Sequence, residues 1–203
     1  MHEFVSTFVF FFTVIDPIGT IPVFIALTRN LSEIERRRIA IRSTVIAAVV
    51  LVFFVLAVEL LLSMMGIPLA AFQIAGGAVL FLFALSMIFG ESKPEEELNR
   101  VGGDADAAVF PLAIPSIASP GAMLAAVMLT DKDRFDLWEQ LFTTSILLLV
   151  LGITLVLMLW ATRIHRLIGN SGASVLSRIM GLILSSAAVA SMLAGIDAYF
   201  SLR

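Results

Sequence analysis

The sequence contains no cysteine, only two histidines and few charged residues. Asp, Glu, Lys and Arg make up 14% of the 203 residues, whereas soluble domains carry about 25%. The lack of cysteine excludes disulfides and thiolate chemistry, and His2 and His165 lie too far apart for a metal-ligand spacing. The net charge of -3 is too small to favour nucleic acid as a partner. No catalytic set of side chains is found, so we expect no enzyme activity, no metal site and no cofactor.

Most of the sequence is apolar, with 60% hydrophobic residues. A bilayer core about 30 Å thick needs roughly 20 apolar residues in a helix. The sequence therefore predicts an all-α membrane protein with the lipid bilayer as its surroundings. The first segment is longer than the apolar core of a signal peptide, so we expect it to be retained. The six predicted spans are residues 4–28, 39–63, 67–90, 107–130, 140–162 and 177–199.

The basic residues predict an orientation for these six spans. If the N-terminus lies outside, the inside loops hold most of the Lys and Arg residues, including Arg36, Arg37 and Arg38. Cytoplasmic loops are enriched in such residues, so both termini are predicted on the outer, periplasmic side. The polar stretch 93–106 is predicted to be a cytoplasmic linker.

A comparison of the chain with itself indicates an internal repeat. Pro17 and Pro120 lie 103 residues apart, and Gly76 and Gly181 lie 105 apart. We predict a first three-helix repeat over 1–92 and a second over 107–203, which enters the membrane from the opposite side because three is odd. Such inverted repeats are typical of secondary transporters, whose binding sites lie near the midplane. Duplication in a purely structural protein is the alternative.

Two predicted spans, the first and the fourth, contain corresponding helix breaks. Pro17 and Pro120 each remove a backbone N–H donor near the middle of a span. Half-helices that begin after such breaks point N–H groups at an anion, and freed carbonyls suit an ammonium group or a cation. A zwitterionic amino acid fits both, although kinks that serve packing alone stay an alternative. The candidate substrate-binding residues are Asp16, Pro17, Gly19, Thr20, Ser119, Pro120 and Gly121.

Asp16 is the charged residue closest to the middle of a predicted span. A carboxylate there costs about 2.5–3.5 kcal/mol on insertion scales, so it needs a partner or a function. It is predicted to carry a proton, to bind a cation or a substrate ammonium, or to cap the following half-helix, as Ser119 would in the other half. The sequence does not indicate whether H+ or Na+ would drive transport. Close helix approach is expected at Gly76, Gly77 and Gly181.

Four motifs resemble those of the MarC family of bacterial and archaeal integral membrane proteins. The family often has Arg in place of Gln73, and its members carry Asn or Asp at position 16. The resemblance implies six spans and a cytoplasmic (inner) membrane location. Some members are described as transporters or exporters of small neutral amino acids such as alanine and glycine, and the family is loosely grouped with LysE-type exporters. The motifs are residues 16–28, 72–77, 111–122 and 178–182.

Together these features predict a secondary transporter that exports small neutral amino acids by alternating access. One alternative is a channel for small cations or other solutes. The other is a membrane factor that does not transport and is linked to stress or antibiotic resistance through a partner. The sequence is compatible with assembly of the protein into a homo-oligomer.

Overall fold

The computed structural model describes residues 2–29, 31–89, 108–130 and 136–201. This part of the chain is helical, at 89% helix, and contains no strand, which confirms the all-α prediction. The predicted linker 93–106 lies outside the described residues. The helices are α1 (His2–Ile15), α2 (Thr20–Leu27), α3 (Glu33–Phe53), η1 (Phe54–Val58), α4 (Glu59–Met64), α5 (Leu69–Phe89), η2 (Ala108–Ile117), α7 (Pro120–Met128), α8 (Leu137–Leu159) and α9 (Ala161–Ser201), with η marking wide π-type turns.

Five helical stretches are long and apolar enough to cross a membrane, and a bent pair of helices makes a sixth if it counts as one span. The bent pair is η2 and α7, whose axes differ by 55°. Five of the six predicted spans each overlap one of the five long stretches, and the fourth, residues 107–130, overlaps the bent pair. The five stretches are Glu3–Leu27, Glu33–Met64, Leu69–Phe89, Leu137–Leu159 and Ser174–Ser201.

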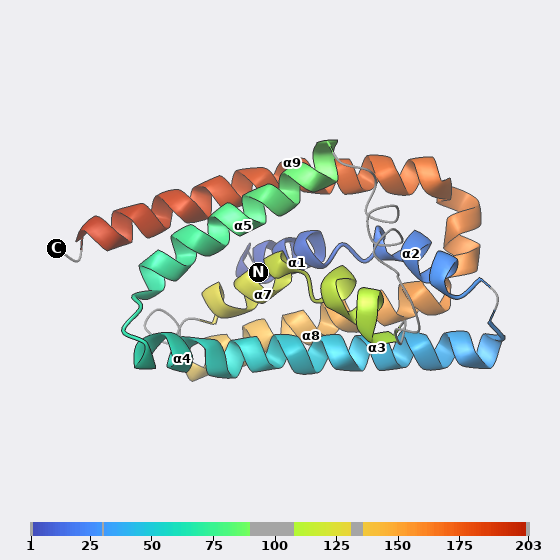
Figure 1. Ribbon diagram of the computed structural model, residues 1–203, viewed down its shortest axis with the longest axis horizontal. Coiled ribbons are helices and arrows are strands. Elements are labelled where there is room, and N and C mark those ends of the chain that lie inside the picture. Colours follow the sequence, from blue (N-terminus) through green and yellow to red (C-terminus); the bar gives the residue numbers. More distant parts are fainter. Residues whose placement is uncertain (1, 30, 90–107, 131–135, 202–203) are drawn as a thin grey trace.

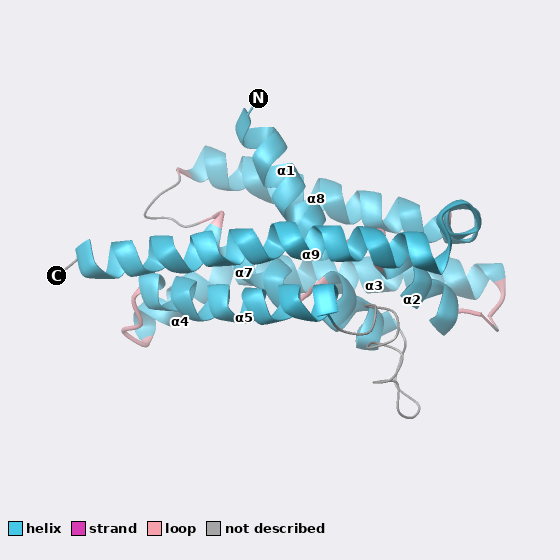
Figure 2. Cartoon of the chain, turned by 90° about the horizontal axis from the view of Figure 1, so that it is seen from above, coloured by secondary structure: helices cyan, strands magenta, loops and turns pink. Residues whose placement is uncertain are grey.

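The helices form three layers. α5 and α9 lie side by side in one outer layer, and α3 with its continuation through η1 and α4 lies beside α8 in the other (Figure 1). The interrupted pairs, α1 with α2 and η2 with α7, fill the middle layer; in the view from above α7 lies behind α5 and α9, and α1 projects past α9 (Figure 2). Each layer therefore contains one span from each half of the chain.

The middle layer is shielded from the surroundings of the protein. In the first span 67% of the most apolar window is buried inside the protein, whereas 18% to 33% is buried in the other four long stretches. Irregular backbone is tolerated at membrane depth only where protein or a wet cavity surrounds it. The interrupted helices thus lie where that requirement is met.

Local sequence signals define where the long helices begin. Ser32 caps α3 and Asp136 caps α8, and in each case a glutamate three residues later bonds back to the backbone of the cap. Gly66 has φ +67°, which only glycine adopts without strain, and it makes the tight turn between α4 and α5. Gly169, also at φ +67°, kinks α9 near its start.

Small residues at every seventh position bring α5 and α9 together. Residues seven apart lie on one face of a helix because seven residues make about two turns. A Cβ on Gly181 would lie 2.9 Å from Met87 Cβ and 3.0 Å from the carbonyl oxygen of Ala84. The buried series are Ala70, Gly77 and Ala84 on α5 and Gly181, Ala188 and Gly195 on α9.

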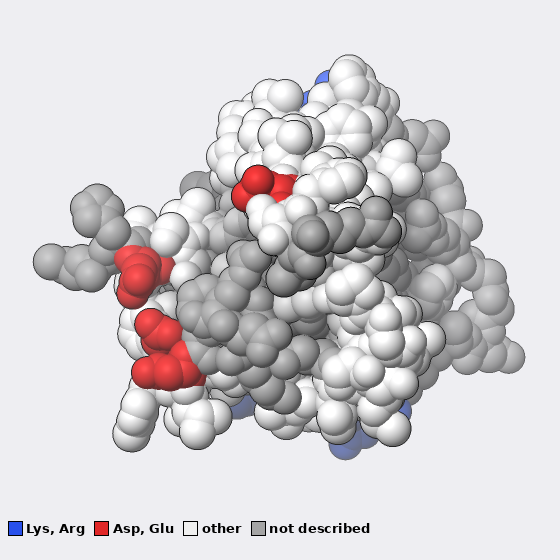
Figure 3. Space-filling model, turned by 90° about the vertical axis from the view of Figure 1, so that its left-hand side faces the viewer, with Lys and Arg blue, Asp and Glu red and all other residues white. Residues whose placement is uncertain are grey.

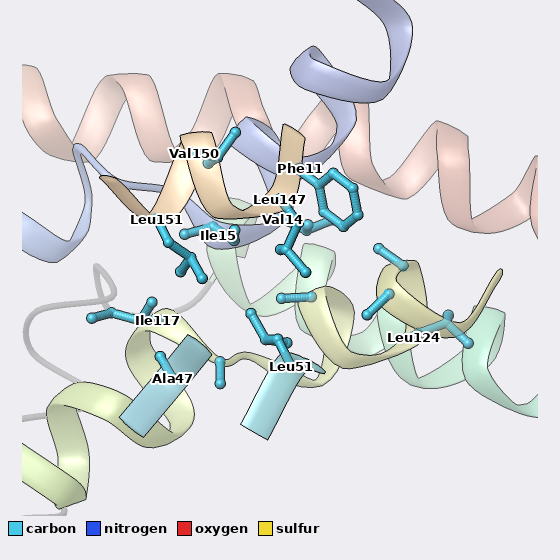
Figure 4. Close-up of a cluster of buried hydrophobic side chains, with 14 of the residues drawn as sticks. Phe11, Val14, Ile15, Ala47, Leu51, Ile117, Leu124, Leu147, Val150 and Leu151 are labelled. Atoms are coloured by element: carbon cyan, nitrogen blue, oxygen red, sulfur yellow. The ribbon is translucent and has the colours of Figure 1, made fainter. Parts of the chain in front are cut away.

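The apolar core lies where the middle layer meets α3 and α8. Side chains of α1 point at α8, and residues of η2, α3 and α7 close the cluster from the other side (Figure 4). Lipid tails are as apolar as these side chains, so dispersion and close fit stabilise the contact more than transfer from water does. Fully buried members include Phe11, Val14, Ile15, Leu51, Leu147 and Leu151.

We expect Gly181→Ala to destabilise the fold by about 1–3 kcal/mol, because the added methyl group would press on backbone across the α5–α9 contact. Gly152→Ala on α8 is the matched control, since nothing lies within 4 Å of its added Cβ. There the better helix propensity of alanine should leave stability equal or higher. Thermal unfolding of the purified protein in detergent measures both variants, and equal behaviour of the two would contradict the packing described here.

Candidate functional site

The first helix break lies between α1 and α2, at residues 16–19. α1 ends at Ile15, and Asp16 has φ +48°, in the left-handed region. Asp and Asn tolerate that region better than other non-glycine residues. Pro17 follows and donates no N–H, so the α-helical ladder stops at this point. The local chemistry of two adjacent residues is therefore enough to interrupt the span.

The carboxylate of Asp16 holds the broken segment together. One oxygen accepts a hydrogen bond from the Gly19 backbone N–H at 3.0 Å, and the other accepts one from Ser177 Oγ at 3.0 Å. Asp16 is only 2% exposed. Both carboxyl oxygens thus have a partner inside the protein, one a backbone donor of the same segment and the other a hydroxyl of α9.

The second break lies between η2 and α7. Phe110 and Ile114 each precede a proline and have extended backbone angles, as the proline ring requires of the residue before it. Ser119 then caps α7, with Pro120 at its first position, where the lost N–H has no cost. The first part of the fourth span is therefore wound in wide, irregular turns, and α7 is its one regular half-helix.

Asp16 and Ser119 make the same local contact in the two halves of the chain. Each precedes a proline, and each side chain accepts a hydrogen bond from the N–H three residues later, on Gly19 at 3.0 Å and on Ala122 at 3.1 Å. The two residues are 103 apart, the same spacing as Pro17 and Pro120. Ser119 thus caps α7, as predicted, whereas Asp16 bonds to Gly19, the N-cap residue of α2, and holds the turn before that helix without capping it.

The two breaks are also joined to each other. Ser119 Oγ donates to the carbonyl oxygen of Val14 at 2.8 Å, and the hydroxyls of Thr20 and Ser116 lie 3.4 Å apart. Val14 is near the end of α1, where carbonyl groups run out of helical partners. We call the five side chains that carry these contacts the break cluster: Asp16, Thr20, Ser116, Ser119 and Ser177, all at most 3% exposed.

The remaining candidate residues surround the break cluster. Pro17 and Gly19 are buried beside Asp16, and the space where Gly19 lacks a Cβ is filled by the Asp16 carboxylate. Pro120 is exposed. Gly121, expected at the break itself, lies within α7, where an added Cβ would meet Leu80 at 2.5 Å. Its small size therefore serves close approach to α5, and the break ends before it.

The packing glycines predicted from the sequence lie at helix contacts. A Cβ on Gly76 would overlap the Leu124 side chain of α7, and one on Gly77 would lie 2.6 Å from Met192 Cγ of α9. Gly181 approaches α5 as described above. α5 therefore uses neighbouring glycines to approach both the middle layer and its partner in the outer layer.

Two members of the break cluster, Ser116 and Ser177, were not among the predicted site residues. Ser116 lies three residues before Ser119, and the sequence predicts Ser177 only as the start of the last span. Small hydroxyl residues are common in membrane helices, where many bond only to their own helix, as Thr154 does to the carbonyl oxygen of Val150 at 2.9 Å. Their position in the sequence gives no signal of a distant partner.

The break cluster is closed in this structure. Two surface cavities are described below, and no member of the cluster lines either of them. In the described part of the chain, no group of three or more His, Cys, Asp or Glu residues is arranged to hold a metal ion. The cluster can offer one carboxylate, several hydroxyls and the N–H groups that begin two half-helices.

Comparison with known proteins gives the family. The family model described as "MarC family integral membrane protein" matches residues 1–200. The chain belongs to the MarC family. It is 35% identical over 199 residues to a UPF0056 membrane protein of Methanocaldococcus jannaschii, with 97% of each chain covered. It is also 35% identical over 198 residues to the UPF0056 inner membrane protein YhgN of Escherichia coli, again with 97% of each chain covered. No solved structure matches.

This MarC family chain is therefore an integral membrane protein, as the resemblance of its motifs implied. One relative is named as an inner membrane protein. The printed names of the relatives give neither a substrate nor an activity. The role of the break cluster has to be argued from its chemistry.

We expect Ser119→Ala to lower stability by about 1–3 kcal/mol, because it removes the cap of α7 and leaves the buried Val14 carbonyl without its donor. Ser185→Ala is the control, since the Ser185 hydroxyl bonds only to Leu182 of its own helix. Ser119→Thr keeps both functions of the hydroxyl and should recover most of the loss. Unfolding temperatures in detergent measure the series, and a loss equal to that of Ser185→Ala would contradict the described contacts.

Proposed function

We propose that this protein is a secondary transporter that exports small neutral amino acids of the alanine and glycine class by alternating access. One observation carries the proposal. The break cluster collects polar side chains from two interrupted helices and from α9 in the interior of an otherwise apolar bundle. Buried polar and ionisable groups are expensive in a membrane and typically mark a path for a solute or an ion. The proposal is of a carrier and not of an enzyme.

The arrangement of the helices supports an inverted repeat of three spans and three spans. Each layer pairs one span from each half, and α2 and α7 leave the breaks in opposite directions along the long axis of the molecule (Figure 1). Asp16 and Ser119 make equivalent local contacts, since each side chain accepts from the N–H three residues later. In the proposed repeat, a pseudo-twofold axis between the two breaks would relate these features. Transporters with such repeats bind their substrates at the repeat interface.

The chemistry of the breaks suits a zwitterion. The Asp16 carboxylate can accept hydrogen bonds from an ammonium group once Ser177 withdraws its hydroxyl. The N–H groups of Gly19, just before α2, and of Ala122, in the first turn of α7, can donate to a carboxylate when the Asp16 and Ser119 side chains turn away. Gly19 is tightly enclosed by the Asp16 and Ser177 side chains, which favours a substrate with a small side chain.

Opening of the site requires the contacts between the breaks to separate. The bonds that would break are Ser119 to Val14, Thr20 to Ser116 and Ser177 to Asp16. Each bond joins a residue of the first half to one of the second. A substrate that binds in their place compensates for the lost hydrogen bonds, which couples binding to the change in conformation. The buried break cluster corresponds to the closed state in this scheme.

We expect counterflow in proteoliposomes loaded with unlabelled alanine, glycine and serine to accumulate labelled L-alanine transiently. Thr20→Val removes one hydroxyl of the cluster at nearly constant volume and should lower the initial rate about tenfold, an amount equal to about 1.4 kcal/mol. Thr154→Val is the matched control, because the Thr154 hydroxyl is buried but bonds only to its own helix. Asp16→Asn should retain most of the rate if Asp16 accepts hydrogen bonds and carries no proton.

The same assay separates the alternatives. Flux without counterflow or stereoselectivity would indicate a channel and contradict a carrier. No accumulation by folded protein would remove small neutral amino acids as substrates, and equal rates in Thr20→Val and Thr154→Val would remove the break cluster as the site.

The charges at the two ends of the bundle support the proposed sidedness, with both termini on the periplasmic side. At the end where α5 and α8 begin, the described charged side chains on the surface are mainly Asp and Glu, and Lys and Arg atoms lie only at the margins of the view (Figure 3). Arg36, Arg37 and Arg38 of α3 lie at the other end. The positive-inside rule assigns that end to the cytoplasm.

We expect Asp197→Cys, in the last turns of α9, to react with a membrane-impermeant maleimide in intact spheroplasts. Arg166→Cys, in the first turns of α9, should react only after permeabilisation. Both side chains are exposed, and the chain has no native cysteine to interfere. The reverse labelling pattern would invert the proposed orientation.

A further inference from the structure

Two surface hollows adjoin one arginine at the start of α3. The first has a volume of about 330 Å³ and lies between α3, the end of α2 and the end of α8, where Phe24, Met158 and Trp160 form apolar walls. The second has a volume of about 480 Å³ and follows the outer face of α3 past Ile34, Ile41 and Val45. Arg37 lines both hollows.

The hollows lie at the level of a membrane surface. The helical stretch from Glu33 to Met64 has 32 residues, or about 48 Å at 1.5 Å per residue, which exceeds a hydrocarbon core of about 30 Å. Its charged first turns therefore reach into the headgroup region. Trp160, which is 60% exposed, lines the first hollow, and tryptophan is enriched at this depth. The apolar face of α3 continues from here into the membrane.

The charge of the hollows is mainly positive. Arg36 and Arg37 line the first hollow together with a single carboxylate, Glu33, and Arg37, Arg38 and Arg42 line the second. Arg36 donates through Nε to the carbonyl oxygen of Thr28 at 3.0 Å. Arg37 is exposed and forms no hydrogen bond or ion pair within the described part of the chain.

The spacing of these residues matches the shape of a lipid. Ile34, Arg37, Arg38, Ile41 and Val45 lie at helical intervals of three and four residues, so they share one face of α3. On this face Arg37 and Arg38 lie nearer the start of α3 than the apolar side chains of Ile41 and Val45, which are 41% and 55% exposed. A phosphate at Arg37 would place an acyl chain along Ile41 and Val45.

We propose that the hollows at Arg37 form a binding site for one anionic phospholipid of the leaflet that faces this end of the protein. The guanidinium of Arg37 holds the phosphate, its neighbouring arginines favour a net negative headgroup over a zwitterionic one, and the acyl chains follow the apolar walls. The site shares no residue with the break cluster, so this proposal stands whether or not the protein transports amino acids.

Native mass spectrometry of the full-length protein tests the site, with equimolar dioleoyl phosphatidylglycerol and dioleoyl phosphatidylcholine added in detergent. We expect the wild-type protein to retain phosphatidylglycerol at least fivefold over phosphatidylcholine. Arg37→Gln should reduce that preference at least fivefold. Arg163→Gln is the matched control, because it removes the same charge from an exposed position that lines neither hollow.

Two further arms separate a lipid from a bare anion. Ile41→Asn should weaken phosphatidylglycerol retention while the arginines stay in place, and excess inorganic phosphate should fail to displace the lipid. Displacement by phosphate, or full retention in Ile41→Asn, would reduce the site to an anion site and overturn the lipid proposal. Equal retention of the two lipids by the wild type would overturn it too, as would an equal loss in Arg37→Gln and Arg163→Gln.

Discussion

Backbone groups inside a membrane have no water to bond with, and this constraint governs how the two helix breaks are built. Each break leaves donors and acceptors without helical partners. Asp16 supplies an acceptor to the Gly19 N–H before α2, and Ser119 supplies an acceptor to α7 and a donor to Val14 of the opposite half. The two interruptions thus satisfy each other, which explains why both lie in the middle layer and face one another.

The outer layers follow from the same constraint. Irregular backbone has to be covered, so α5 with α9 and α3 with α8 enclose the middle layer. Without a hydrophobic force between helices in lipid, close approach of small residues provides the attraction. The seven-residue series of alanine and glycine on α5 and α9 provides it on one side, and Gly76 and Gly121 extend the close contact to α7 and α5. The packing glycines therefore let the surrounding helices approach closely enough to cover the helix breaks.

A cluster that satisfies its own hydrogen bonds is stable when closed and can exchange partners when it opens. In the proposed carrier, a zwitterion takes over the hydrogen bonds that Gly19, Ala122 and Asp16 now form with protein groups. The arginines of α3 line hollows that contain no residue of the break cluster, and in the lipid proposal they act at the membrane surface instead. A lipid held at Arg37 would contact α2 of the middle layer and α3 and α8 of the outer layer beside it.

The sequence by itself determined the elements whose causes are local. Runs of apolar residues specified the helices, and Asp16 with Pro17 and Ser119 with Pro120 specified the breaks, because proline removes a donor wherever it lies. The family also follows from sequence. Tertiary structure alone decided that Ser116 and Ser177 join the cluster, that Gly121 serves packing against Leu80, and that Arg37 lies between two hollows. These facts depend on which residues meet across the layers, and contacts between distant segments arise from packing in three dimensions, which no local pattern encodes.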